Sequence, residues 1–180
     1  MNLPNALSLV RIVLAPFLMA LLIANTGPYT VAAAGLFLAA ALTDYLDGRI
    51  ARTTGQVSTV GQLLDPVADK LLIAAALIAL VQVGRAPAWK VVLMVGREIA
   101  VTGLRAIAAA QGVIIAASDF GKAKMVAQVV AVALLILAAN PVVWVAGTVA
   151  LAVALVLALG SGVDYFWRFL ARAFKGREAM

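Results

Sequence analysis

The sequence predicts an all-α, polytopic membrane protein with about six transmembrane helices, forming a single domain over residues 1–180. Of its 180 residues, 65% are hydrophobic and 12% are charged, whereas a soluble domain is about 45–50% apolar. One spanning helix uses about 20 mostly apolar residues, so the apolar content suits six spans. This content leaves no room for a separate soluble domain.

Apolar runs and the turn residues between them predict where the first three helices lie. The first run, residues 6–25, has no cationic start and no cleavage site, so we expect a retained span rather than a signal peptide. It ends at NTGP, a cluster of turn residues. The second run covers residues 31–50 and ends at the longest polar stretch of the chain. The third covers residues 63–83.

The second half of the chain repeats this alternation of apolar runs and breaks. Gly84 to Pro87 precedes the fourth run, Gly112 to Gly121 the fifth, and Asn140-Pro141 the sixth. These breaks predict helices over residues 87–111, 122–139 and 142–168.

Lysine and arginine are distributed unequally between the two sides of the predicted bundle. The opposite side carries two, Arg85 and Lys90. The side of both termini carries eight, namely Arg49, Arg52, Lys122, Lys124, Arg168, Arg172, Lys175 and Arg177. The positive-inside rule therefore predicts a cytoplasmic N-terminus. The net charge of +6 is explained by this asymmetry and by a basic tail suited to an anionic leaflet. We expect no nucleic-acid partner.

Cysteine and histidine are both absent from the sequence. The chain therefore has no thiol nucleophile and no cysteine-held metal. It also lacks the usual general base and zinc ligand. Any acid–base or metal chemistry must use carboxylates.

Four of the eight acidic residues lie between positions 44 and 69. Asp44 and Asp47 are three apart at the end of the second predicted helix, and Asp65 and Asp69 are four apart near the start of the third. Each spacing places a pair on one helix face, and the short connection brings the pairs to the same cytoplasmic end. Four gathered carboxylates repel one another strongly.

A divalent cation is the simplest remedy for this repulsion, and all-oxygen ligation favours Mg²⁺, Mn²⁺ or Ca²⁺. Four carboxylates suffice for two such ions, an arrangement that serves phosphoryl chemistry. The alternative is a structural cluster that Arg49, Arg52 and Lys70 partly neutralise. Carboxylates within a membrane are costly and usually functional, which favours the metal.

The segment DYLDGRIARTTGQVSTVGQLLDPVAD combines these aspartates with a fixed set of small and basic residues. It reads Asp44-x2-Asp47-Gly48-x2-Ala51-Arg52-x8-Gly61-x3-Asp65-x3-Asp69. This looks like the full signature of the CDP-alcohol phosphotransferase family, whose members join a CDP-linked lipid to an alcohol and release CMP.

The resemblance implies a role for each residue of the signature. The four aspartates would hold two divalent cations, Mg²⁺ or Mn²⁺, and Asp69 would also take the proton of the attacking hydroxyl. Gly48, Gly61 and Ala51 would let the nucleotide approach the backbone closely, although small residues also serve helix packing. Arg52 would contact a phosphate, or serve only as a positive-inside anchor.

The remaining cations bear on the acceptor alcohol. Arg97 and Arg105 are eight apart on nearly the same face of the fourth predicted helix, and Lys122 and Lys124 begin the fifth. If they converge on the metal site, the acceptor carries its own anion, and glycerol 3-phosphate is the smallest common one. These cations could instead have roles that involve no acceptor. One of the arginines could form a structural ion pair with Glu98, and the lysines could serve only to set the orientation of the chain in the membrane.

Shorter segments resemble one branch of the family, the bacterial phosphatidylglycerophosphate synthases. They are NLPNALSLVRIVLAP, LLDPVADKLL, GREIAVTGLR and GKAKMVAQ. This resemblance implies CDP-diacylglycerol and glycerol 3-phosphate as substrates, with Arg97, Arg105 and Lys122 on the acceptor phosphate and Arg11 as a further candidate. It also implies a homodimer among membrane lipids, in a bacterial inner membrane, with the active site facing the cytoplasm.

Other acceptors remain open at this point, namely inositol phosphate, serine or phosphatidylglycerol. A different class of function, a divalent-cation carrier, would use the same carboxylates. A carrier needs access from both sides, whereas the polar residues gather at one end of the predicted bundle.

Overall fold

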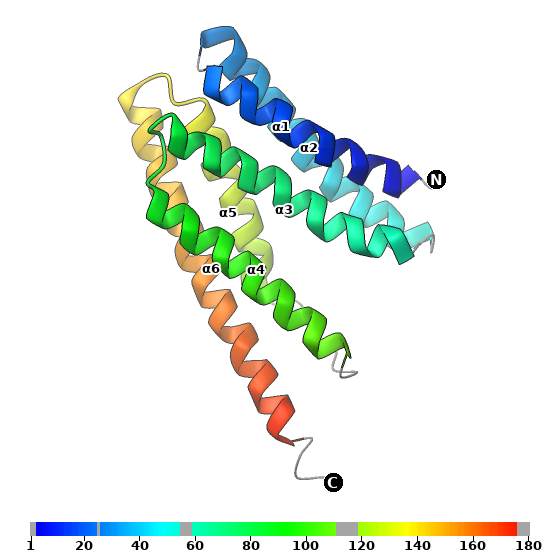
Figure 1. The fold of residues 1–180 in the computed structure, drawn as a ribbon. Coiled ribbons are helices and arrows are strands. Elements are labelled where there is room, and N and C mark those ends of the chain that lie inside the picture. Colours follow the sequence, from blue (N-terminus) through cyan, green and yellow to red (C-terminus); the bar gives the residue numbers. More distant parts are fainter. Residues whose placement is uncertain (1–2, 25, 55–58, 111–118, 176–180) are drawn as a thin grey trace.

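The computed structural model consists of six long helices (Figure 1). It describes the backbone of residues 3–24, 26–54, 59–110 and 119–175. Within these ranges the side chains of residues 44–54, 59–66 and 69, and of some residues at the ends of α1, α5 and α6, are outside the description. The helices are α1 (Leu3–Ala24), α2 (Gly27–Thr54), α3 (Thr59–Gln82), α4 (Ala88–Ala110), α5 (Asp119–Ile136) and α6 (Pro141–Lys175). No strand occurs among these residues, so the all-α prediction is confirmed.

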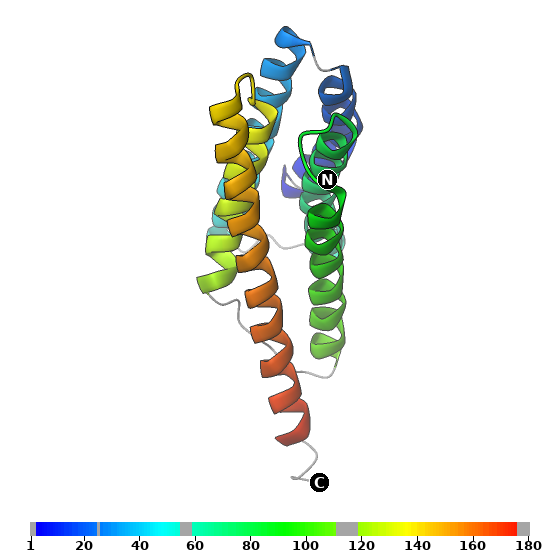
Figure 2. The ribbon, with the colours of Figure 1, turned by 90° about the vertical axis from the view of Figure 1, so that its left-hand side faces the viewer.

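The helices pack in two layers, seen edge-on in Figure 2. One layer holds α1, α3 and α4, and the other holds α2, α5 and α6. The most extensive contacts are between α1 and α3 and between α5 and α6, while α4 contacts α6 across the layers. Large buried side chains such as Phe37, Leu77 and Leu135 fill the space between helices, together with many alanines. Small residues allow helix backbones to approach closely, as is common in membrane bundles.

The turn between α3 and α4 follows from Gly84, whose φ of 72° is in the left-handed region. The N–H of Gly84 donates to the carbonyl of Val81 at 3.0 Å, and that of Arg85 donates to Leu80 at 2.8 Å. This pair of bonds is the Schellman motif that ends many helices at glycine. The predicted break at Gly84 to Pro87 is therefore confirmed.

Arg85 also fixes the end of a neighbouring helix. Its Nη1 donates to the carbonyls of Leu135 and Ile136, the last residues of α5, at 3.3 and 2.5 Å. A cation at a helix C-terminus satisfies carbonyls that have no partner within the helix. This long-range contact explains why α5 ends at Ile136, three residues before the predicted boundary.

Other helix boundaries also differ from the prediction: α1 begins at Leu3 rather than residue 6, α2 runs to Thr54 rather than 50, α3 begins at Thr59 rather than 63, and α5 begins at Asp119 rather than 122. α2 begins at Gly27 rather than residue 31, because Pro28 is tolerated in a first helical turn and the N–H of Thr30 donates to Thr26 at 2.9 Å. α6 continues through the basic tail to Lys175, and there Arg168 Nε donates to Asp164 Oδ1 at 2.9 Å, one turn apart. With 35 residues, α6 is about 50 Å long.

One segment within the described residues, Pro141–Ala171, is long and apolar enough to cross a membrane by length and composition. Shorter apolar segments are Ser8–Ala24, Gly27–Thr43 and Lys70–Gln82. α4 carries four charged residues along its 23-residue length, namely Lys90, Arg97, Glu98 and Arg105.

Gly147 sets the distance between α5 and α6, which yields a test of the packing. A Cβ at this position would be 2.9 Å from Cγ of Leu135 and 3.1 Å from its backbone nitrogen. Because the backbone cannot rotate away, we expect Gly147→Ala to cost about 1–3 kcal/mol of stability. Thermal unfolding of the detergent-purified protein measures the loss.

The matched control for this test is Gly35→Ala. Gly35 is also helical, but a Cβ there meets nothing within 4 Å. Alanine is a better helix former by about 0.5–1 kcal/mol, so this variant is expected to melt at or slightly above the wild-type temperature. Equal melting of the two variants would show that the α5–α6 distance does not depend on Gly147.

Candidate active site

The backbone places both aspartate pairs at the same end of the bundle. Asp44 and Asp47 lie in the C-terminal half of α2, and Asp65 and Asp69 lie in the N-terminal half of α3. Figure 1 shows that these two helix ends lie at the same end of the molecule as the N-terminus. The side chains of all four are outside the described residues, so their role as metal ligands stays a prediction.

The other signature residues lie on the same two helix segments. Gly48, Ala51 and Arg52 follow the first pair in α2, and Gly61 precedes the second pair in α3. Their side-chain surroundings also fall outside the described residues. Among the side chains that are described, no group of three or more carboxylates could hold a metal ion.

A cavity of about 740 Å³ lies between α3, α4 and α5. Its walls are the middle of α3, from Val67 to Ala74, the middle of α4, from Val95 to Arg105, and the first half of α5. The cavity adjoins the aspartate segment in α3, where the lining residues Val67 and Lys70 stand on either side of position 69. Four of the five predicted acceptor residues line the cavity, namely Arg97, Arg105, Lys122 and Lys124. The structure brings these four together from two helices.

Arg11 is the predicted acceptor residue that is not among those lining this cavity. It lies in α1 and is 4% exposed. The sequence spacing gave no information on this point, because α1 and α4 are separated by two helices along the chain.

The cavity is strongly cationic. Among its described lining residues are five cations, Lys70, Arg97, Arg105, Lys122 and Lys124, and one acid, Glu98. A concave site with a surplus of positive charge attracts an anionic ligand. Its volume is in the range of a small-molecule site.

Glu98 joins two of these cations. Its Oε1 accepts a bond from Nη1 of Arg97 at 2.8 Å and a short one from Nζ of Lys124. The side chains are only 12% exposed for Arg97, 19% for Glu98 and 10% for Lys124. The alternative reading of an ion pair between Glu98 and an arginine is thus realised for Arg97, and the same carboxylate also connects α4 to α5.

Arg97 continues this network to α6. Its Nε donates to the carbonyl of Ala158 at 2.8 Å, and its Nη2 donates to Oγ of Ser161 at 2.7 Å. Three of the five guanidinium N–H groups are therefore occupied by the protein. The other two have no protein partner among the described residues, and Arg97 lines the cavity.

Arg105 is held differently. Its Cζ lies 5.3 Å from the ring centroid of Tyr165 on α6, a cation–π contact. Arg105 is exposed, whereas Tyr165 is 6% exposed. The ring therefore orients a guanidinium that otherwise faces open space.

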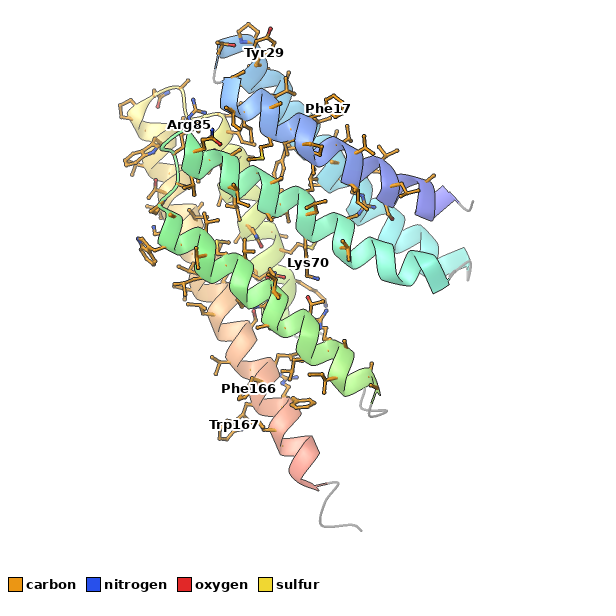
Figure 3. The ribbon with its side chains drawn as sticks, viewed as in Figure 1. Phe17, Tyr29, Lys70, Arg85, Phe166 and Trp167 are labelled. Carbon is orange, nitrogen blue, oxygen red and sulfur yellow. The ribbon has the colours of Figure 1, made fainter. Side chains whose placement is uncertain are left out.

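Sequence reasoning missed three polar residues of this cavity. Lys70 was considered only as a counter-charge for the aspartates, but it projects from α3 into the space next to α4 (Figure 3). Thr102 and Gln128 were not considered. The sequence signal for Gln128 was a lone amide in an apolar run, four residues after Lys124. In the structure Gln128 is 3% exposed.

The shared carboxylate of Glu98 yields a testable consequence. Glu98→Ala removes the carboxylate that pairs with the largely buried Arg97 and Lys124. We therefore expect a loss of about 1–3 kcal/mol in stability. Thermal unfolding in detergent measures this loss. The control is Asp164→Ala, which removes a more exposed pair with Arg168 and is expected to cost about 0–1 kcal/mol. Similar melting of both variants would mean that the buried network adds nothing to stability.

Comparison with known proteins bears on the whole chain. A CDP-diacylglycerol–glycerol-3-phosphate 3-phosphatidyltransferase of Bacillus subtilis is 42% identical over 180 residues, covering 92% of this chain and 93% of the relative. A protein of the same name from Escherichia coli K12 is 38% identical, covering 91% and 92%. Another, from Rickettsia typhi, is 33% identical, covering 92% and 95%.

The family model described as CDP-alcohol phosphatidyltransferase matches residues 1–160. This match includes both aspartate pairs and all of the helices that line the cavity. Together with three relatives that align over nearly their full lengths, it shows that the chain belongs to the CDP-alcohol phosphatidyltransferase family.

Proposed function

We propose that this protein transfers the phosphatidyl group of CDP-diacylglycerol to glycerol 3-phosphate, giving phosphatidylglycerol phosphate and CMP. The names of its relatives from Bacillus subtilis and Escherichia coli state this pair of substrates. The observation that carries the proposal is the cavity between α3, α4 and α5, whose described lining residues include five cations and one acid and suit a phosphorylated acceptor. An uncharged or zwitterionic acceptor such as serine needs less cationic lining.

The aspartate quartet fits two divalent cations, Mg²⁺ or Mn²⁺. The donor set consists of carboxylates alone, in a chain without histidine or cysteine, which is the ligand chemistry these hard ions prefer. We assign Asp44, Asp47, Asp65 and Asp69 as the ligands. When bound, such ions neutralise charge on the pyrophosphate as CMP leaves.

Asp69 has a second role in this proposal. The hydroxyl oxygen of the acceptor attacks the phosphorus that carries the diacylglycerol, and the bond from this phosphorus to the CMP oxygen breaks. Asp69 accepts the proton of the hydroxyl. Its neighbour Lys70 lines the cavity, so position 69 is at the border between the aspartate segment and the acceptor site, as a base must be to reach the nucleophile.

The CDP-lipid is assigned to the signature residues around the aspartates. Gly48, Ala51 and Gly61 offer a surface on which little side chain hinders the nucleotide, and Arg52 offers a guanidinium to a phosphate.

The acceptor phosphate is assigned to four cavity residues, Arg97, Arg105, Lys122 and Lys124. Arg97 keeps two N–H groups for this purpose, which suffices for a bidentate contact with phosphate oxygens. Arg11 does not line the cavity, so the proposal leaves it out of the acceptor site.

The arrangement of side chains supports six membrane spans. Bulky apolar side chains are exposed on the outside of the bundle, among them Val142 at 78%, Trp167 at 71% and Val92 at 68%. Figure 3 shows Phe17 and Trp167 projecting away from the bundle. Conversely, Lys124 and Gln128 are buried. An apolar exterior is unfavourable in water and suits lipid, whereas buried polar groups such as these are kept away from lipid.

Sidedness follows from the basic residues. By the positive-inside rule, the excess of lysine and arginine that the sequence puts on the side of both termini supports a cytoplasmic orientation of the aspartate end of the bundle, in a bacterial inner membrane. The homodimer expected from the family resemblance stays a prediction.

The acceptor assignment is tested by product analysis. Purified protein is incubated with CDP-diacylglycerol and Mg²⁺, with glycerol 3-phosphate, inositol 1-phosphate or serine in separate reactions. We expect phosphatidylglycerol phosphate from the first reaction alone, with one CMP per lipid formed, as mass spectrometry detects. Product from another acceptor would overturn the acceptor assignment, and absence of any lipid product or CMP would overturn the transfer reaction.

The assignment of Asp69 as base predicts a separate outcome. Asp69→Asn keeps the shape but cannot accept the proton, so we expect turnover to fall by about 10²–10⁴-fold, while CDP-diacylglycerol still binds in part. CMP release measures turnover. The control is Asp164→Asn, which alters a carboxylate in the C-terminal half of α6 and is expected to retain activity. Near-normal turnover of Asp69→Asn would refute its role as base.

A further inference from the structure

We infer that α6, none of whose described residues lines the cavity, positions the two arginines that bind the acceptor phosphate. The inference rests on the proposed function, in which Arg97 and Arg105 contact that phosphate. Both arginines come from α4, and both are held from behind by side chains or backbone of α6.

The contact with Arg97 fixes the plane of its guanidinium. Nε donates to the Ala158 carbonyl at 2.8 Å and Nη2 donates to Ser161 Oγ at 2.7 Å. Ser161 is itself fixed, because its Oγ donates to the same carbonyl at 3.0 Å. Two bonds from one planar group to one turn of helix leave it little freedom to rotate.

Gly162 makes room for this arrangement. A Cβ at position 162 would lie 3.3 Å from both Cγ and Nε of Arg97, closer than ordinary van der Waals contact. The arginine cannot move away without stretching its bonds to Ala158 and Ser161. The absence of a side chain at position 162 therefore gives Arg97 the space it occupies against α6.

Tyr165 holds the second arginine in place. The centroid of its ring lies 5.3 Å from Cζ of Arg105. Ala158, Ser161 and Tyr165 follow one another at intervals of three and four, so they lie on one face of α6. On α4, the two arginines are eight residues apart, also on nearly one face. Two turns of α6 thus face two turns of α4, and one rigid helix sets the spacing of both cations.

The family match ends at residue 160, before Ser161, Gly162 and Tyr165. A binding group held in place before the ligand arrives costs less to order on binding, so α6 is expected to act on the affinity for the acceptor and not on that for the CDP-lipid.

The first test compares two glycine variants of the same helix. Gly162→Ala places a methyl group against Arg97, whereas Gly160→Ala places one where nothing lies within 4 Å. We expect Gly162→Ala to raise KM for glycerol 3-phosphate about tenfold, which corresponds to one charged hydrogen bond. KM for CDP-diacylglycerol and kcat should stay near wild-type values, and Gly160→Ala should match wild type throughout.

The second test uses Tyr165. Tyr165→Phe keeps the ring and is expected to keep the wild-type KM for glycerol 3-phosphate. Tyr165→Leu removes the cation–π contact and is expected to raise that KM about threefold. This pair does not depend on the glycine variants, and the Phe variant serves as the conservative rescue.

A binding measurement separates this inference from the proposed function. The rise in melting temperature on adding glycerol 3-phosphate, without CDP-diacylglycerol, reports binding without turnover. A wild-type protein that binds glycerol 3-phosphate but forms no lipid product would refute the proposed transfer, and weaker binding by Gly162→Ala than by Gly160→Ala would still support positioning by α6. Equal KM and equal binding for the two glycine variants, or parallel changes in KM for both substrates, would overturn the inference.

Discussion

The carboxylate of Glu98 is the contact on which the cavity depends. It lies among cations that would otherwise repel one another across α4 and α5, and it accepts bonds from both Arg97 and Lys124. Because Arg97 also bonds to α6, one acid connects three helices. Burying charged groups costs free energy, but breaking a buried ion pair costs free energy as well. The ion pairs of Glu98 therefore hold the helices in one arrangement. Among the described lining residues of the cavity, this acid stands against five cations.

The described outer surface of the molecule is more apolar than that of a soluble bundle, while a few polar side chains are buried. Valine, tryptophan and phenylalanine side chains face outwards, while Lys124, Gln128 and Ser161 are buried. In the lipid environment that we propose for this bundle, apolar burial gives no net force between helices, so close packing and polar contacts must hold them together. The approach of α5 to α6 at Gly147 and the bonds of Arg85 to the end of α5 are examples of each.

The proposed chemistry is divided between neighbouring helices. The aspartate segment spans the end of α2 and the start of α3, and the cationic cavity continues from α3 into α4 and α5. Position 69 and position 70 lie at the border, with a predicted base followed by a lysine that lines the cavity. A single helix, α3, therefore connects the part assigned to the CDP-lipid with the part assigned to the acceptor. α6 stands behind this surface and sets the geometry of its arginines.

The sequence by itself determined the number and order of the helices, because apolar runs and turn residues are local signals. It also determined the aspartate signature, whose spacing along two helices needs no tertiary information, and the gathering of cations in the fourth and fifth helices. Only the tertiary structure decided which of those cations share a cavity. It showed that Lys70 belongs to the lining and that Arg11 does not, and that Glu98 bonds to Lys124 as well as to Arg97. It also brought Ser161 and Tyr165 against the arginines of α4. These contacts join residues 26 to 64 positions apart. They arise from the packing of one helix against another, and the periodicity of a single helix does not specify that packing.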